Sequence, residues 1–216
     1  MKSKLFILIS FVFVITNLQA AYDFYALNSD GVRIYYSIQA GSGNRVMVEK
    51  TEGTVYTGII NIPDSVTYEG ETYAVAAIGE GAFAGSGITV VSIPDSVKTI
   101  REYAFAGCYN LTDIIIPDGV TTIRNDAFRE CKSLKNVSFG KNISTIGSWA
   151  FYGCSKLESI ILSDKVTTID FQAFLGCSGL KSITLSESLT EISDDVFAGC
   201  SSLESILLVI ARALRV

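Results

Sequence analysis

Residues 100–117 read IREYAFAGCYNLTDIIIP, and residues 146–163 read IGSWAFYGCSKLESIILS. Both stretches carry, in the same order and at the same spacing, an isoleucine, an Ala-Phe dipeptide, a cysteine, a leucine and two aliphatic residues two apart. Working outward in both directions, the pattern recurs in six copies. Their phenylalanines are Phe83, Phe105, Phe128, Phe151, Phe174 and Phe197. The first step between them is 22 residues and the next four are 23, which indicates an internal repeat.

The repeat unit predicts one short strand and a return segment. A pair such as Ile160 and Leu162 has a period of two, so both side chains face the same side of a strand. Pro94 and Pro117 follow two of the pairs, and proline ends a strand because it has no amide for the ladder. One such unit cannot bury its apolar columns alone, whereas stacked units bury them as a continuous core. The pattern therefore predicts a repeat solenoid, mostly β, with short strands and turns.

The unit C-x-x-L-x-x-I-x-L-P-x-x-V-x-x-I-x-x-x-A-F resembles the BspA-type leucine-rich repeat, and the resemblance covers residues 73–208. It implies a leucine-rich-repeat-like solenoid and a secreted or cell-surface protein of bacteria, especially Bacteroidetes, or of some mucosal protozoa. Studied members are associated with adhesion to host matrix proteins or to other microbes. The resemblance carries no active site, and so implies a non-enzymatic, adhesin-like protein with a protein or glycoprotein ligand. The alternative is a structural or truncated fragment of a longer repeat array, without a function of its own.

The N-terminus has the pattern of a secretory signal peptide. Lys2 and Lys4 precede the apolar run of residues 5–15, and Leu18-Gln19-Ala20 has the spacing of a signal-peptidase site. A membrane anchor, the alternative, needs about 20 apolar residues, and this run is shorter. We therefore expect residues 1–20 to be removed and the exported chain to begin at Ala21, with no membrane insertion afterwards.

Residues 21–72 lack the full repeat, and we expect them to form a β-rich N-terminal cap. Tyr22–Leu27 and Val32–Ile38 alternate apolar with polar residues around the turn sequence Asn28–Gly31, which predicts a β-hairpin. Ile62–Val66 repeats the order of residues seen at Ile93–Val97, so it is interpreted as a degenerate half-repeat. The end of a solenoid exposes apolar core, so a capping unit is expected there. A separate ligand-binding module is the alternative.

The cysteines form one column rather than a disulfide framework. They are Cys108, Cys131, Cys154, Cys177 and Cys200. Neighbours in a sheet ladder lie about 4.8 Å apart with parallel Cβ vectors, whereas a disulfide brings Cβ atoms to about 3.8 Å. We therefore expect five buried, reduced thiols.

Composition argues against several classes of function. The chain has no histidine, which removes Ser-His-Asp and Cys-His catalytic arrangements and the commonest metal ligand. It has 17 basic and 22 acidic residues, and loss of Lys2 and Lys4 changes the net charge from −5 to −7. Such a chain has no electrostatic reason to bind nucleic acid or anionic lipid. No catalytic residue, cofactor or metal site is predicted.

Two surfaces are candidates for binding a partner. Parallel strands would align their outward residues in rows along a strand face. The first candidate surface is this strand face, which has two rows. The first row is Ser92, Ile115, Ser138, Ile161, Thr184 and Leu207, and the second row includes Asp113, Asn136, Ser159 and Ser182. The second candidate patch, on the return side, consists of Tyr103, Trp149, Tyr152 and Phe171. The alternative is that these positions reflect strand propensity alone.

The C-terminal end differs from an ordinary repeat. Residues 209–216 read VIARALRV and contain no polar capping unit. An uncapped solenoid exposes apolar columns and an unpaired strand edge. We therefore expect self-association through this end, or truncation of a longer array.

Overall fold

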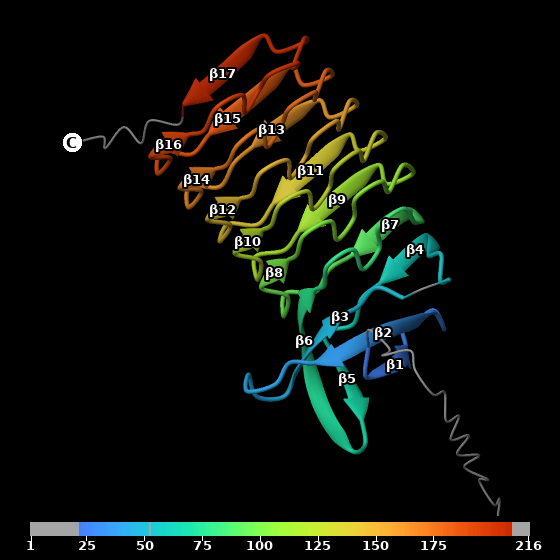
Figure 1. Ribbon diagram of the computed structural model, residues 1–216. Coiled ribbons are helices and arrows are strands. Elements are labelled where there is room, and N and C mark those ends of the chain that lie inside the picture. The colour runs from blue at the N-terminus through green and yellow to red at the C-terminus, as the bar shows by residue number, and fades with distance from the viewer. Residues whose placement is uncertain (1–21, 52, 209–216) are drawn as a thin grey trace, which may run out of the picture.

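The computed structural model describes residues 22–51 and 53–208 (Figure 1). Within these residues it contains 17 strands joined by turns, and no helix. The coils stack along one axis, which confirms the predicted repeat solenoid. The predicted signal peptide and the C-terminal tail lie outside the described residues.

One side of the solenoid is a parallel sheet with one strand per coil. Its order is β17-β15-β13-β11-β9. The strands are β9 (Asp113–Ile116), β11 (Asn136–Phe139), β13 (Ser159–Ile161), β15 (Ser182–Leu185) and β17 (Ser205–Leu208). Their aliphatic pairs point into the coil; Ile160 and Leu162, for example, are buried. This parallel sheet is called the strand face below.

The opposite side consists of two-residue strands, also paired in parallel. They are β8 (Thr99–Ile100), β10 (Thr122–Ile123), β12 (Thr145–Ile146), β14 (Thr168–Ile169) and β16 (Glu191–Ile192). In the first four, the isoleucine is fully buried and the threonine is partly exposed. This alternation follows from the period of two along a strand.

The N-terminal cap extends the sheet of two-residue strands. β1 (Phe24–Leu27) and β2 (Arg33–Ile38) form an antiparallel hairpin, as predicted. β3 (Arg45–Val48) pairs with β2 and with β6 (Glu71–Ile78), and β6 pairs with β8. The cap therefore continues the ladder of the solenoid without a break in the sheet.

Two further pairings complete the cap. β5 (Ser65–Tyr68) forms a hairpin with β6, closed by Glu69 and Gly70, which both have positive φ. Two left-handed residues are typical of the tight turns that join hairpin strands; the sequence analysis missed this hairpin because it assigned Ile62–Val66 to a half-repeat. β4 (Thr57–Asn61) pairs in parallel with β7 (Gly87–Ser92), as consecutive coils do.

A stack of phenylalanine rings runs through the core. The six repeat phenylalanines lie face to face, with neighbouring ring centroids 5.1–5.9 Å apart and ring planes within 13° of parallel. The first five are 0–1% exposed. The stack arises because every coil places the same side chain at the same point of its turn, so burial depends on neighbouring coils.

The cysteine column lies beside this stack, and the prediction of buried free thiols is confirmed. Each Sγ donates a hydrogen bond to the carbonyl oxygen of the phenylalanine in the preceding coil, at 3.1–3.2 Å. Ser86 occupies the equivalent position in the first repeat, and its Oγ donates to Phe83 O at 2.6 Å. The column thus gives these buried carbonyl oxygens a second donor, because each also accepts a backbone N–H from the residue three positions later, as Phe128 O does from Cys131 N at 3.2 Å.

The two ends of the described solenoid differ. At the N-terminal end, Asn28 Nδ2 of the β1–β2 turn donates to Asn61 O of β4 at 3.0 Å, and Asn61 Nδ2 donates to Asp30 at 2.7 Å. At the other end, Ile206 and Leu208 are 51% and 64% exposed, although their counterparts in earlier coils are buried or, in β11, partly buried. The cap covers one cross-section of the core, and no described residue covers the other.

Candidate functional site

The strand face aligns the predicted rows in register. In the second row Asp113, Asn136, Ser159 and Ser182 pair in turn with one another. In the first row Ile115 pairs with Ser138, and Ile161 pairs with Thr184, which pairs with Leu207. Figure 1 shows these strands side by side along the solenoid.

Side chains of the first row face solvent. Ile115 and Ile161 are each 70% exposed and Leu207 is 55% exposed, while Ser138 is exposed and Thr184 is partly exposed. The aliphatic side chains stand in alternate coils, so they are about 9–10 Å apart along this part of the face. This spacing places separate apolar contacts among small polar groups.

Ser92 lies outside the hydrogen-bonded ladder of this face. Its strand β7 pairs with β4 in a separate two-stranded sheet, so the ladder contains five of the six expected strands. The turn before β7 is one residue shorter than the later turns. The segment from Phe83 to Ile88 is one residue shorter than its counterpart in the next coil, from Phe105 to Leu111. The ladder is interrupted at the repeat whose turn differs.

The second row is polar and forms hydrogen bonds between coils. Asn136 Nδ2 donates to Asp113 Oδ1 at 2.5 Å. This hydrogen bond, with that of Thr112, lowers the pKa of the exposed Asp113 carboxyl below its ordinary value. Asp113 is therefore ionised at neutral pH and contributes a negative charge beside the aliphatic row.

The second candidate patch lies at a corner of the coil where the backbone is left-handed. One residue per coil, from the second repeat onward, has φ of 55–57°. These residues are Tyr103, Asp126, Trp149, Gln172 and Asp195, called the corner column below. Residues other than glycine rarely adopt this φ. The first repeat has Gly81 at the equivalent position, with φ 59°.

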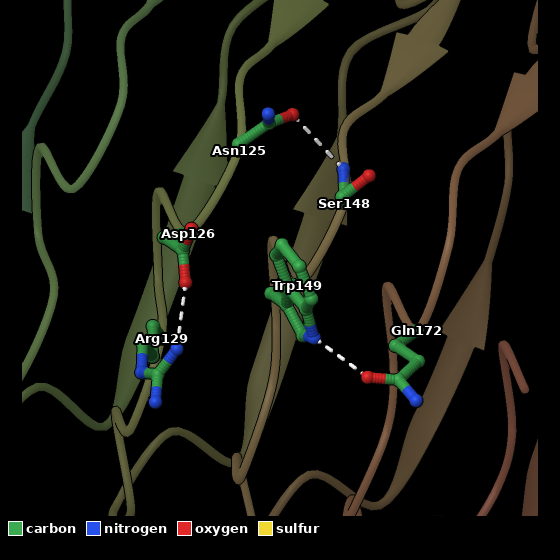
Figure 2. A network of polar contacts seen from close by, with 6 residues as sticks. All are labelled: Asn125, Asp126, Arg129, Ser148, Trp149 and Gln172. Atoms are coloured by element: carbon green, nitrogen blue, oxygen red, sulfur yellow. Dashed lines mark hydrogen bonds and ion pairs between the residues drawn. The ribbon is translucent and has the colours of Figure 1, made fainter.

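Side chains of the corner column contact one another between coils. Figure 2 shows Trp149 Nε1 donating to Gln172 Oε1, at 2.7 Å. The Trp149 ring also meets Phe171 edge-on, with centroids 5.5 Å apart. Asp126 pairs with Arg129 at 3.0 Å, and the guanidinium of Arg129 lies over the Tyr152 ring at 4.7 Å.

The four predicted aromatic residues are therefore arranged along one edge but do not form a continuous apolar patch. Trp149 contacts Phe171, whereas the charged side chain of Asp126 lies between Tyr103 and Trp149 in the column. The charge of Asp126 raises the pKa of the exposed Tyr103 hydroxyl. The sequence analysis missed Arg129, although its distance of 23 residues from Tyr152 indicates that they are neighbours.

The described residues contain no cluster of metal-binding side chains. No group of three or more Cys, Asp or Glu side chains among them is arranged to hold a metal ion. Within the same residues, no helix has the length and apolarity needed to cross a membrane. What the two candidate surfaces offer is extended contact area with separate apolar, aromatic and charged groups.

Comparisons with known proteins agree with this architecture. The sequence model of a family described as "BspA type Leucine rich repeat region" matches residues 98–210 in six copies. The crystal structure of the leucine-rich-repeat protein TpLRR of T. pallidum has 26% sequence identity and a TM-score of 0.69, over 89% of this chain and 85% of that one. A leucine-rich-repeat protein of Eubacterium ventriosum ATCC 27560 has 21% identity and a TM-score of 0.55, over 85% of this chain and 48% of that one. No curated protein sequence matches the chain.

Proposed function

The chain belongs to the BspA-type leucine-rich-repeat family, and from this premise we propose that it is a non-enzymatic binding protein that uses its strand face to contact a protein or glycoprotein. The single observation that carries the proposal is the in-register row of exposed aliphatic side chains, Ile115, Ile161 and Leu207. Strand propensity accounts for β-branched residues at such positions, whereas contact with a partner would also account for three large aliphatic side chains exposed in one row. Burial against a partner would stabilise the complex by about 25 cal/mol per Å² of apolar surface.

The shape of the face favours an extended partner. Five parallel strands at about 4.8 Å spacing form a surface roughly 20 Å across the coils. The row offers separate aliphatic contacts rather than one deep pocket. An extended peptide segment or a loop of a host matrix or microbial surface protein fits such a surface, since repetition produces broad contact areas.

The proposal places the protein outside the cell or at its surface. It is supported by the signal-peptide pattern of residues 1–20 and by the family resemblance of the repeats. The cysteines suit this location, because the described structure buries all five rather than exposing reactive thiols.

Replacement of Ile161 by aspartate tests the strand face. We expect Ile161→Asp to fold with nearly unchanged stability, because the side chain is 70% exposed, and to weaken binding to an immobilised extracellular-matrix preparation by about tenfold or more. Thr168→Asp, on the opposite sheet, is the matched control and should bind like the natural protein. Loss of folding in Ile161→Asp, or equal binding by both variants, would contradict the proposal.

Self-association through the C-terminal end is a second property that we propose. It is supported by the edge of β17, which pairs with no further strand among residues 22–51 and 53–208, and by the exposure of Ile206 and Leu208, which face inward in the pattern of the repeat. An unpaired edge with exposed apolar residues is a template for pairing with another chain.

A further inference from the structure

A depression lined by positive charges lies where the cap meets the first coils. It has a volume of about 160 Å³. Four cationic side chains line it, those of Arg45, Lys98, Arg101 and Arg124. Three of the five arginines among the described residues therefore converge on one place. Gln39 and Thr99 add groups that form hydrogen bonds.

Strand pairing explains why these residues meet. Arg45 begins β3, which pairs with β6, and β6 pairs with β8. Arg101 and Arg124 directly follow β8 and β10, so they are in the same column of successive coils, about 4.8 Å apart. The cap supplies one wall of the depression and the repeats supply the other.

Small side chains form part of the lining and leave room for a ligand. Ala77 pairs with Thr99, so both occupy the outer face of the sheet, and Ala76 precedes it in β6. Both alanines are at most 9% exposed. A residue larger than Ala77 on the outer face would fill space between the arginines, so the cavity depends on this alanine.

Few carboxylates neutralise this cluster. The cluster has one ion pair among the described residues, a long contact of 3.8 Å between Arg124 Nη1 and Glu102 Oε1. Lys98 Nζ donates to the backbone oxygen of Asp95 at 3.3 Å. Burial raises the pKa of the Glu49 carboxyl, while a hydrogen bond from Ser37 and the nearby charge of Arg101 act to lower it. Four cations therefore share the depression with little compensation.

The contrast with the net charge of the chain restricts the ligand. The chain is acidic overall, with a formal charge of −5. Charges beyond the Debye length of about 8 Å are largely screened at physiological ionic strength, so the local field of the depression is positive. A volume of about 160 Å³ has room for a single compact anionic group among the arginines rather than for a long polyanion.

We propose that this depression binds one phosphate group, either free or as a monoester. Phosphate carries about −1.5 to −2 charge at pH 7 and has several strong acceptor oxygens, which suits several cations better than a singly charged carboxylate. Arginine has the fork geometry that phosphate oxygens accept in pairs. The site is separate from the strand face and does not depend on its proposed function.

Calorimetric titration with inorganic phosphate, glucose 6-phosphate, glucose and acetate at constant ionic strength tests the proposal. We expect saturable binding of the natural protein in the millimolar range or tighter by at least one phosphate compound, and none by glucose. Binding by inorganic phosphate indicates a free-ion site, whereas binding by glucose 6-phosphate alone indicates a monoester site. Absence of saturable binding by both, or equally tight binding of acetate, would overturn it.

Two exposed arginines provide the variants. Arg45→Gln and Arg101→Gln should each weaken binding by about tenfold, since each removes a charge-assisted hydrogen bond, and Arg101→Lys should restore part of the affinity. Arg129→Gln, which pairs with Asp126 outside the depression, is the matched control. Unchanged affinity in both Arg45→Gln and Arg101→Gln, with melting temperatures near that of the natural protein, would refute the site. Ile161→Asp should bind phosphate normally, so either proposal can fail alone.

Discussion

At the scale of single residues, stability depends on side chains that repeat from coil to coil. Phe151 lies between Phe128 and Phe174, with ring centroids 5.1 and 5.3 Å away, and is fully buried. The Cys154 thiol beside it is also fully buried. The neighbouring coils surround both side chains, and because protein interiors are close-packed, neither side chain has room to move.

Phe151→Ala tests the stack. Loss of the ring should leave a cavity between two coils and lower the free energy of unfolding by about 3–5 kcal/mol. Urea unfolding followed by circular dichroism measures the change. Ile161→Ala is the control and should stay within about 0.5 kcal/mol, because its side chain faces solvent. Equal costs for the two variants would contradict the assignment of core and surface.

The cysteine column should be chemically inert in the folded protein. Burial raises the pKa of the Cys154 thiol far above its ordinary value, so its reactive thiolate is scarce at neutral pH. Hydrogen bonds with neighbouring thiols lower the pKa of Cys108 and Cys200 at the ends of the column, so these two are protected by burial instead. We expect alkylation of the native protein to be slow at all five cysteines and complete after denaturation, as measured by mass spectrometry. Recovery of a cystine-linked peptide from a fresh sample would contradict the free, buried thiols.

At the scale of elements, the coil turns its corner through one left-handed residue. The corner column contains tyrosine, aspartate, tryptophan, glutamine and aspartate, and yet only glycine adopts this φ without strain. Stacking gives the corner its shape regardless of residue type, since backbone amides of successive coils bond there, as Trp149 N does to Phe171 O at 3.1 Å. The hydrogen bonds between coils therefore outweigh the preference of these residues for a negative φ.

Substitutions at Tyr103 measure this strain. Tyr103→Val should lower the free energy of unfolding by about 1–2 kcal/mol, because a β-branched residue is poorly tolerated in the left-handed region. Tyr103→Asn should change it little, since asparagine enters that region more readily. Urea denaturation of the two variants gives the comparison. Indistinguishable stabilities would show that the corner relaxes to another conformation.

At the scale of the whole molecule, the residues that the structure describes cover the core at one end of the solenoid and leave it uncovered at the other. Hydrogen bonds of Asn28 and Asn61 fasten the cap at the N-terminal end, whereas Leu208 is 64% exposed at the other. The coils contact their neighbours, so an open last coil lacks half of the burial that internal coils have. Association of two chains would supply the missing contact.

Leu208→Lys should reduce self-association. The new charge would stand among the apolar residues of the open end, so we expect sedimentation velocity across a concentration series to show less dimer than in the natural protein. Ile115→Lys is the matched control, because Ile115 is an exposed aliphatic residue of the strand face in β9, far from this end. A natural protein that stays monomeric at high concentration would show that the end does not associate.

Much of the architecture follows from the period of the sequence. Columns 23 residues apart identify the buried phenylalanines, the free thiols and the outward row, because stacking places equivalent residues one above another. The same arithmetic indicates neighbours such as Trp149 and Gln172. A repeating sequence thus encodes its own contacts between coils, since each coil meets the next in the same register.

Tertiary structure alone decided the features that break the repeat. The cap has no period, so the position of Arg45 near Arg101 depends on the pairing of β3 with β6 and of β6 with β8. The left-handed φ of the corner is likewise invisible in residue types, and the shorter turn of the first repeat does not by itself reveal that the ladder breaks between β7 and β9. Their physical reason is that the hydrogen-bonded ladder as a whole sets strand register and backbone angle, and it overrides the local preferences from which a sequence is interpreted.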